Sequence, residues 1–137
     1  MLQPFNGDNL LRREYEKNIR ENDVKANLES IILRKLTKYE LHGYEFIKEI
    51  REEFGVYLGP STIYPTLKEL EKMGLVASRW DHSSERPRKV YRITIKGLKY
   101  LRLERDVKNR NRKKMNELSA KQFCIQPLQP VEVEIQK

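Results

Sequence analysis

The amino-acid sequence predicts an α+β fold that is mainly helical. Three observations support this prediction. Apolar residues recur at helical spacing up to Gly74, β-branched and aromatic residues then gather in two short runs, and helical spacing returns after Thr94. We therefore expect several helices, then a hairpin of two strands, then a final helix.

Two helical segments are expected at the N-terminal end. The first carries an apolar stripe formed by Leu10, Leu11, Tyr15 and Ile19, and the second extends from Val24 to Leu36. The sequence is compatible with one bent helix or with two separate ones. A third helix is expected from His42 to Phe54, because Gly55 follows at the position where a left-handed residue commonly ends a helix.

The fourth helix is expected to begin at Gly59 or Pro60, since proline suits the first helical position, and to stop at Gly74. Its apolar members Ile63, Leu67 and Leu70 share one side of the helix. Pro65 lacks the N–H that would bond to the Ser61 carbonyl. We therefore expect a distorted or 3₁₀-like first turn.

Two strands are expected after Gly74, over residues 75–80 and 90–94, with a long polar loop from Asp81 to Lys89 between them. Thr94 can cap a last helix that begins at Ile95. Two helices joined by a four-residue connector and followed by a hairpin are typical of a winged helix-turn-helix. Here that fold has an extra N-terminal helix and a long C-terminal helix.

This pattern predicts four segments along the chain. Residues 1–24 form an N-terminal extension with a dimerisation helix, and residues 25–94 form the winged helix-turn-helix. Residues 95–121 form a basic C-terminal helix, and residues 122–137 form an extended or disordered tail.

Charge and composition narrow the function. The chain has 28 Lys and Arg against 20 Asp and Glu, for a net charge of +8, and residues 95–121 hold 10 basic and 3 acidic side chains. Such a basic stripe attracts a polyanion. One cysteine excludes an intramolecular disulfide, and no apolar run approaches the roughly 20 residues of a membrane span. We expect a cytoplasmic protein without a secretion signal.

Catalysis has little support in the sequence. His42 and His82 are the two histidines, and neither a catalytic triad nor a phosphate-binding glycine loop is evident. His42 suits a helix cap better than a catalytic base. We expect a protein that is not an enzyme and that requires no metal or cofactor.

The residues expected to contact DNA lie on the fourth helix and in the hairpin, which forms the wing. If the apolar side of the helix is buried, its opposite face can meet base edges and phosphates in the major groove. The basic loop of the wing suits the minor groove or the DNA backbone. The candidates are Ser61, Thr62, Tyr64, Pro65, Lys68 and Lys72 on the helix, and Arg79, Arg86, Arg88 and Lys89 in the wing.

Three blocks of the sequence resemble the signature blocks of the PadR-like transcriptional regulators. They are His42–Ile47, Ser61–Val76 and Arg88–Thr94, and the resemblance covers about residues 26 to 100. It implies a dimeric winged-helix repressor that binds a pseudo-palindromic operator in double-stranded DNA. It also implies that the recognition helix spans Pro60–Met73 and the wing Arg79–Arg92, and that the third helix begins against the DNA backbone through His42, Gly43 and Tyr44. No small-molecule effector is identified.

A homodimer is also expected from the surplus of apolar residues, because one winged helix cannot bury both terminal stripes alone. The residues concerned are Leu10, Leu11, Tyr15, Ile19, Ile95, Leu98, Leu101 and Leu103. Two alternatives stay open at this point. The fold can serve as a protein-interaction adapter, or the basic helix can bind nucleic acid without sequence preference.

Overall fold

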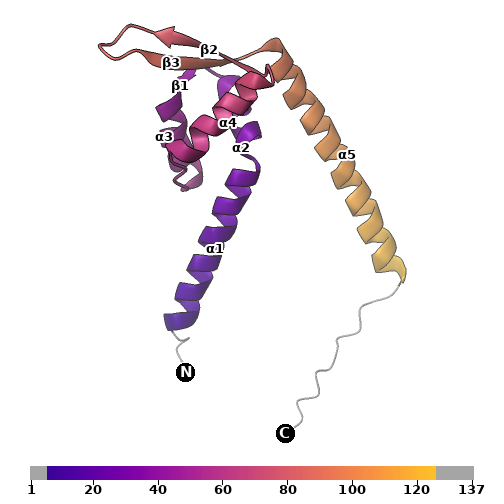
Figure 1. The fold of residues 1–137 in the computed structure, drawn as a ribbon. Coiled ribbons are helices and arrows are strands. Elements are labelled where there is room, and N and C mark those ends of the chain that lie inside the picture. The colour runs from indigo at the N-terminus through magenta and orange to yellow at the C-terminus, as the bar shows by residue number, and fades with distance from the viewer. Residues whose placement is uncertain (1–5, 126–137) are drawn as a thin grey trace. The chain divides into compact units, whose positions relative to one another are not determined.

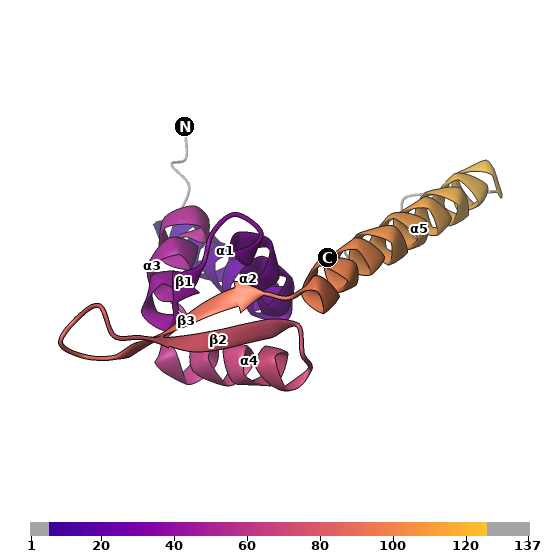
Figure 2. The same ribbon diagram turned by 90° about the horizontal axis from the view of Figure 1, so that it is seen from above.

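The computed structural model describes the backbone of residues 6–125 and the side chains of residues 7–120. These residues fall into two compact units, one up to Leu101 and the other from Arg102 onward. The elements are shown in Figures 1 and 2 and are, in order, α1 (Asn6–Ala26), α2 (Leu28–Leu36), β1 (Leu41–His42), α3 (Gly43–Phe54), α4 (Pro60–Lys72), β2 (Val76–Asp81), β3 (Arg88–Ile93) and α5 (Ile95–Ile125). The prediction of a mainly helical α+β fold is confirmed.

Helices α1 and α2 are separated at Asn27. The Asn27 side-chain amide donates to the Asp23 carbonyl at 2.8 Å. Asparagine side chains compete with regular helix hydrogen bonding in this way, which explains the break. The choice between one bent helix and two is therefore settled in favour of two. Val24, expected to open the second helix, lies inside α1 instead.

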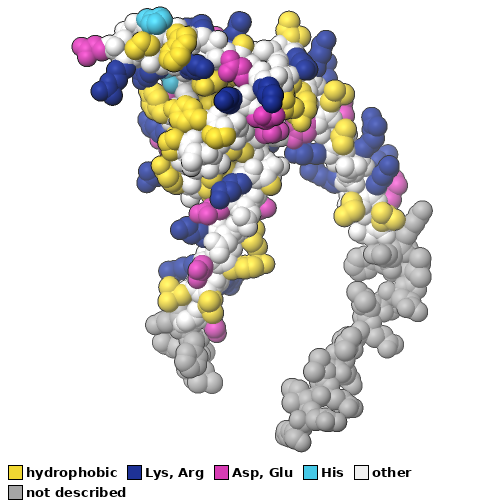
Figure 3. All heavy atoms as spheres, viewed as in Figure 1, with side chains coloured by type: hydrophobic (Ala, Val, Ile, Leu, Met, Phe, Trp, Pro, Cys, Tyr) yellow, Lys and Arg dark blue, Asp and Glu magenta, His cyan; other side chains and the backbone are white. Residues whose placement is uncertain are grey.

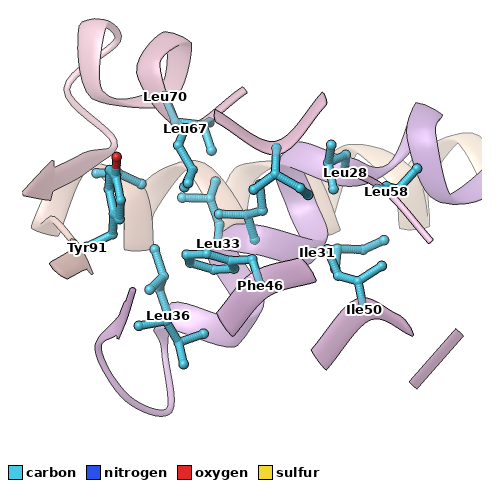
Figure 4. Close-up of a cluster of buried hydrophobic side chains, with 14 of the residues drawn as sticks. Leu28, Ile31, Leu33, Leu36, Phe46, Ile50, Leu58, Leu67, Leu70 and Tyr91 are labelled. Carbon is cyan, nitrogen blue, oxygen red and sulfur yellow. The ribbon is translucent and has the colours of Figure 1, made fainter. Parts of the chain in front are cut away.

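The hydrophobic core lies within the first unit, among α2, α3, α4 and the sheet (Figure 4). Phe46 and Ile50 from α3 have no exposed surface, and neither do the three apolar residues predicted to share one side of α4, namely Ile63, Leu67 and Leu70. Each such side chain contributes about 1.5–3 kcal/mol through burial. The predicted orientation of α4 is thus confirmed.

Pro65 is accommodated without interrupting α4. Near the start of the helix, the Gly59 carbonyl accepts the N–H of Thr62 at 3.0 Å and that of Ile63 at 3.1 Å. The first of these bonds is of the 3₁₀ type, and the second is of the α type. The expected distortion is therefore limited to the 3₁₀-type hydrogen bond from Thr62 to Gly59, and Pro60–Lys72 is otherwise a regular α-helix.

The sheet has three antiparallel strands in the order β1-β3-β2. Strands β2 and β3 form the predicted hairpin, with Val76 opposite Ile93 and Asp81 opposite Arg88. Strand β1 was not predicted, because a strand of two residues has no measurable periodicity. It pairs Leu41 with Tyr91 and so attaches the segment before α3 to the hairpin. Figure 2 shows β2 running beside α4.

Helix α5 begins as predicted. The Thr94 hydroxyl accepts the N–H of Gly97 at 3.0 Å, which is an N-terminal cap. The helix continues to Ile125, so residues 122–125 are helical where a tail was predicted. The rest of that predicted tail, residues 126–137, lies outside the described residues. Among residues 6–125, no helix combines the length and apolar character needed to cross a membrane.

Gly97 is the position in α5 where added volume is least tolerable. A Cβ there would lie 2.3 Å from the Leu75 carbonyl oxygen and 2.7 Å from Cγ1 of Ile93. The Leu75 oxygen also accepts the N–H of Thr94 at 3.1 Å, so it cannot move without loss of that bond. We expect Gly97→Ala to lower the free energy of unfolding by about 1–3 kcal/mol, measured by urea denaturation.

The matched control is Gly7→Ala, because a Cβ at position 7 in α1 has no atom within 4 Å. This change is expected to be neutral or slightly stabilising, since alanine favours a helix over glycine. Equal stability of the two variants would contradict the packing described for Gly97.

Candidate nucleic-acid interface

The outward face of α4 carries the side chains that the sequence placed there. Ser61, Pro65, Lys68 and Lys72 are exposed, and the Tyr64 side chain is 43% exposed. Thr62 is half-buried. This face results directly from the buried stripe on the other side of the helix, because side chains on opposite sides of a helix cannot both be buried in one core.

Gly43 lets the start of α3 lie directly against Tyr64. Gly43 is buried, and a Cβ at this position would lie 2.4 Å from Cε1 and 2.9 Å from Cζ of the Tyr64 ring. The resemblance implied a contact between Gly43 and the DNA backbone. In the structure Gly43 has a packing role, in which it sets the position of a tyrosine on the outward side of α4, and its contact with DNA stays a prediction.

His42 connects the start of α3 to the end of β2. Its backbone N–H donates to Oε1 of Glu45 at 3.1 Å, and Nδ1 of its ring is hydrogen-bonded to the same oxygen. Nε2 of the ring lies 3.1 Å from Oδ2 of Asp81. His42 therefore caps α3, as expected, and also fastens the base of the wing.

The two carboxylates around His42 both have a pKa below the ordinary value. Burial alone would raise the pKa of Glu45, but hydrogen bonds from the His42 side chain and backbone hold that pKa below its ordinary value. The pKa of Asp81 is lowered by hydrogen bonds from Ser83 and then by His42. Asp81 also accepts the backbone N–H of Ser83 at 3.0 Å, which orders the first turn of the wing loop.

Arg88 is part of a contact between the wing and α3. Its Nη1 donates to the Tyr44 hydroxyl at 2.8 Å, and its guanidinium carbon lies 5.4 Å from the centre of the Tyr44 ring. The rings of His42 and Tyr44 stack at 6.0 Å. Arg88 was predicted to project toward DNA as part of a basic finger. In the structure Arg88 is half-buried and braces the wing, and its contact with DNA stays a prediction.

Arg79 is exposed but has a carboxylate partner, and its contact with DNA stays a prediction. Its Nη2 is paired with Oε2 of Glu40 at 2.6 Å, before β1. Ser78, the residue before it, bonds to Glu71 of α4 at 2.6 Å. Because successive strand residues point to opposite faces, Arg79 is directed away from α4. Arg86 and Lys89 remain exposed in the wing, and Lys and Arg side chains are visible on the wing in Figure 3.

Trp80 was not among the predicted site residues, yet it lies on the same side of the wing as α4. This side chain is 58% exposed, and Nζ of Lys89 lies 5.4 Å from its ring centre. Trp80 lies two residues after Ser78 in β2, so the period of two places both on the side of α4. That alternation was the signal in the sequence that could have identified it.

The residues predicted for dimerisation divide into two groups. Leu101 is partly buried and packs against the core of its own unit. This explains why it is not available at the surface, in contrast to the prediction. The others are exposed: Leu10, Leu11, Tyr15, Ile19, Ile95, Leu98 and Leu103.

Comparison with known proteins identifies the family. Residues 32–103, more than half of the chain, match the model of the transcriptional regulator PadR-like family. The chain belongs to the PadR-like family. This agrees with the prediction of a transcriptional regulator that is not an enzyme. Within the described residues, no cluster of three His, Cys, Asp or Glu side chains could hold a metal ion.

Two curated relatives of this PadR-like chain are transcriptional regulators, and each matches it over part of its own length. It is 35% identical over 88 residues to the transcriptional activator GvpE of Haloferax mediterranei, a match that covers 64% of this chain and 44% of GvpE. It is 38% identical over 66 residues to the transcriptional regulator Rv3488 of Mycobacterium tuberculosis, covering 48% and 61% of the two chains. The matches thus span less than two thirds of either relative.

Solved structures of PadR-like regulators have the same fold. A PadR family transcription regulator from Clostridium difficile is 30% identical, with a TM-score of 0.58 and coverage of 67% of this chain and 97% of the other. A regulator of the same family from Eggerthella lenta is 28% identical, with a TM-score of 0.63 and coverage of 81% and 93%.

The contact between Gly43 and Tyr64 can be tested with a double-mutant cycle. We expect Gly43→Ala to lower the free energy of unfolding by about 1–3 kcal/mol, because the new methyl group displaces the Tyr64 ring. In a Tyr64→Ala background the same change should cost much less, since the obstructing ring is gone. Thermal and urea unfolding of the four proteins give the coupling energy, and additivity of the two changes would contradict the contact.

Proposed function

We propose that this PadR-like protein binds double-stranded DNA in a sequence-specific manner and regulates transcription. The observation that carries the proposal is the single surface on which the outward face of α4, the start of α3 and the wing adjoin. On this surface α4 enters the major groove, and the wing contacts the minor groove or the backbone.

The proposed contacts follow the chemistry of the exposed side chains. Ser61, Thr62, Tyr64, Lys68 and Lys72 can reach base edges or nearby phosphates from α4. In the wing, Arg86 and Lys89 supply charge for the backbone. Arg88 and His42 act indirectly in this proposal, by fixing the wing against α3.

We further propose that the active species is a homodimer. Residues 7–20 of α1 are all exposed, and an isolated helical segment of this length is only marginally stable without packing. A groove of about 540 Å³ between α1 and the rest of the first unit is lined by four apolar side chains, Ile19, Val24, Ile31 and Phe54, and by polar ones, namely Glu16, Arg20, Asp23, Asn27 and Arg34. A second copy, packing α1 with the start of α5, would cover these surfaces and place two recognition helices ~34 Å apart.

The direction of regulation is proposed to be repression, through occupation of an operator near a promoter. The relative GvpE is named an activator. A promoter-reporter assay with and without the protein therefore decides between repression and activation.

The proposed function would place the protein in the cytoplasm with its target DNA. A protein-interaction adapter would show no duplex preference in the assay below.

The DNA-reading roles are tested by selecting bound sequences from a random duplex pool and measuring affinities for the selected site. Lys68→Ala and Ser61→Ala should relax base preference, with a loss of about 1–3 kcal/mol on the selected site. Arg86→Ala with Lys89→Ala should weaken binding to all duplexes alike and reduce the salt slope by about 2.

The matched control is Lys38→Ala, an exposed lysine in the loop before β1 that removes the same charge away from α4 and the wing. This variant should select the same DNA sequence and bind it with the affinity of the wild type. Binding that shows the same affinity for selected and random duplex would support nucleic-acid binding without sequence preference instead.

The homodimer is tested by sedimentation equilibrium at micromolar concentration. Tyr15→Glu places a charge in the exposed apolar stripe of α1 and should shift the protein toward monomer. Lys17→Glu alters a charge on another face of the same helix and should leave the dimer intact. A wild-type protein that sediments as a monomer would refute the dimer.

A further inference from the structure

A cleft of about 650 Å³ separates α4 from the wing. On the α4 side it is lined by Tyr64 and Lys68, and on the wing side by Trp80, Arg88 and Lys89. All of these residues belong to the first compact unit. The cleft therefore lies inside one folded body, between the two elements that the proposed function assigns to neighbouring grooves of DNA.

The cleft has the charge expected of an anion site. Among the described residues, no ion pair neutralises Lys68 or Lys89, whereas Arg88 interacts with the charge of Glu45 without forming a salt bridge. Nε of Arg88 is buried without a hydrogen-bond partner, while its Nη1 is engaged by Tyr44. Glu71 also lines the cleft, but its Oε1 accepts the Ser78 hydroxyl at 2.6 Å. Three cations thus face one carboxylate.

The cleft also has an apolar wall. The Trp80 ring is more than half exposed, and Nζ of Lys89 lies 5.4 Å from its centre. An exposed indole beside unpaired lysines offers a flat surface for a sugar or base and an N–H donor for a phosphate. A cleft with both properties suits the sugar-phosphate chain better than a simple inorganic anion.

We propose that this cleft seats the backbone of one DNA strand, and that Trp80 is a direct DNA contact. The proposal rests on the proposed function. When α4 lies in the major groove and the wing in the adjacent minor groove, the strand that separates those grooves runs between the two elements. Lys89 then binds a phosphodiester from the wing side, while Lys68 reaches an adjoining base edge from the α4 side. The Trp80 ring packs on the neighbouring deoxyribose, and Arg88 braces the wing side through Tyr44.

The experiment uses Trp80 as its own reporter, because it is the single tryptophan of the chain. The full-length protein is titrated with the selected duplex while tryptophan fluorescence and acrylamide quenching are recorded. Duplex should change the emission and shield Trp80 from acrylamide. In a binding assay with labelled duplex, Trp80→Ala should lose about tenfold in affinity on selected and random sequences alike, while Trp80→Phe retains most of it.

The matched control is Tyr57→Ala, which removes another exposed aromatic ring, 63% exposed, from the connector between α3 and α4. It should leave DNA affinity unchanged. Thermal unfolding of each variant establishes that the comparison concerns folded proteins.

The outcomes separate the two proposals. Absence of any duplex binding would defeat the proposed function. Duplex binding that leaves Trp80 open to acrylamide, with Trp80→Ala binding like the wild type, would overturn the cleft proposal alone. Inorganic phosphate serves as a third probe. Shielding of Trp80 by phosphate that duplex does not displace would assign the cleft to a free anion and overturn the backbone assignment.

Discussion

The burial of one edge of α4 is the constraint on which the rest of the surface depends. Ile63, Leu67 and Leu70 have no exposed surface, and together they fix the rotation of the helix about its own axis. A rotation that exposed one of them would forfeit about 1.5–3 kcal/mol for that side chain alone. The polar face of α4 therefore points outward because its apolar edge has a single place to pack.

The wing is held by a different kind of interaction. Its base is fastened to α3 by two polar contacts, His42 to Asp81 at 3.1 Å and Tyr44 to Arg88 at 2.8 Å. Both contacts involve residues of the short segment 42–44, where β1 passes into α3. The same stretch includes Gly43, which receives the Tyr64 ring of α4. One segment thereby sets the spacing between the wing and α4, the two elements that the proposed function assigns to DNA.

Periodicity made most of the helices and the outward face of α4 predictable from the sequence, because local repeats report burial directly. The errors concern contacts between distant residues. His42 and Asp81 are 39 positions apart, as are Arg79 and Glu40, and nothing in a linear pattern pairs them. Consequently Arg79 and Arg88 were read as free cations from their charge, although Arg79 pairs with Glu40 and Arg88 donates to the Tyr44 hydroxyl. Trp80 was missed for the converse reason, since its exposure depends on which side of the hairpin faces α4.

The distribution of charge bears on how such a surface can discriminate between DNA sequences. Residues 1–94 hold 17 basic and 15 acidic side chains, whereas residues 95–121 hold 10 and 3. The larger excess therefore lies in α5, whereas residues 60–93, which include α4 and the wing, hold 7 basic and 4 acidic side chains. Because non-specific attraction to DNA scales with the number of neutralised phosphates, α5 can supply affinity that ignores sequence. In the proposed function, the smaller charge excess of α4 and the wing adds little general attraction beside that of α5, so discrimination between sequences comes from the fit of their side chains to the duplex. This is why the rotation of α4 and the position of the wing, rather than the net charge of +8, should decide which duplex is bound.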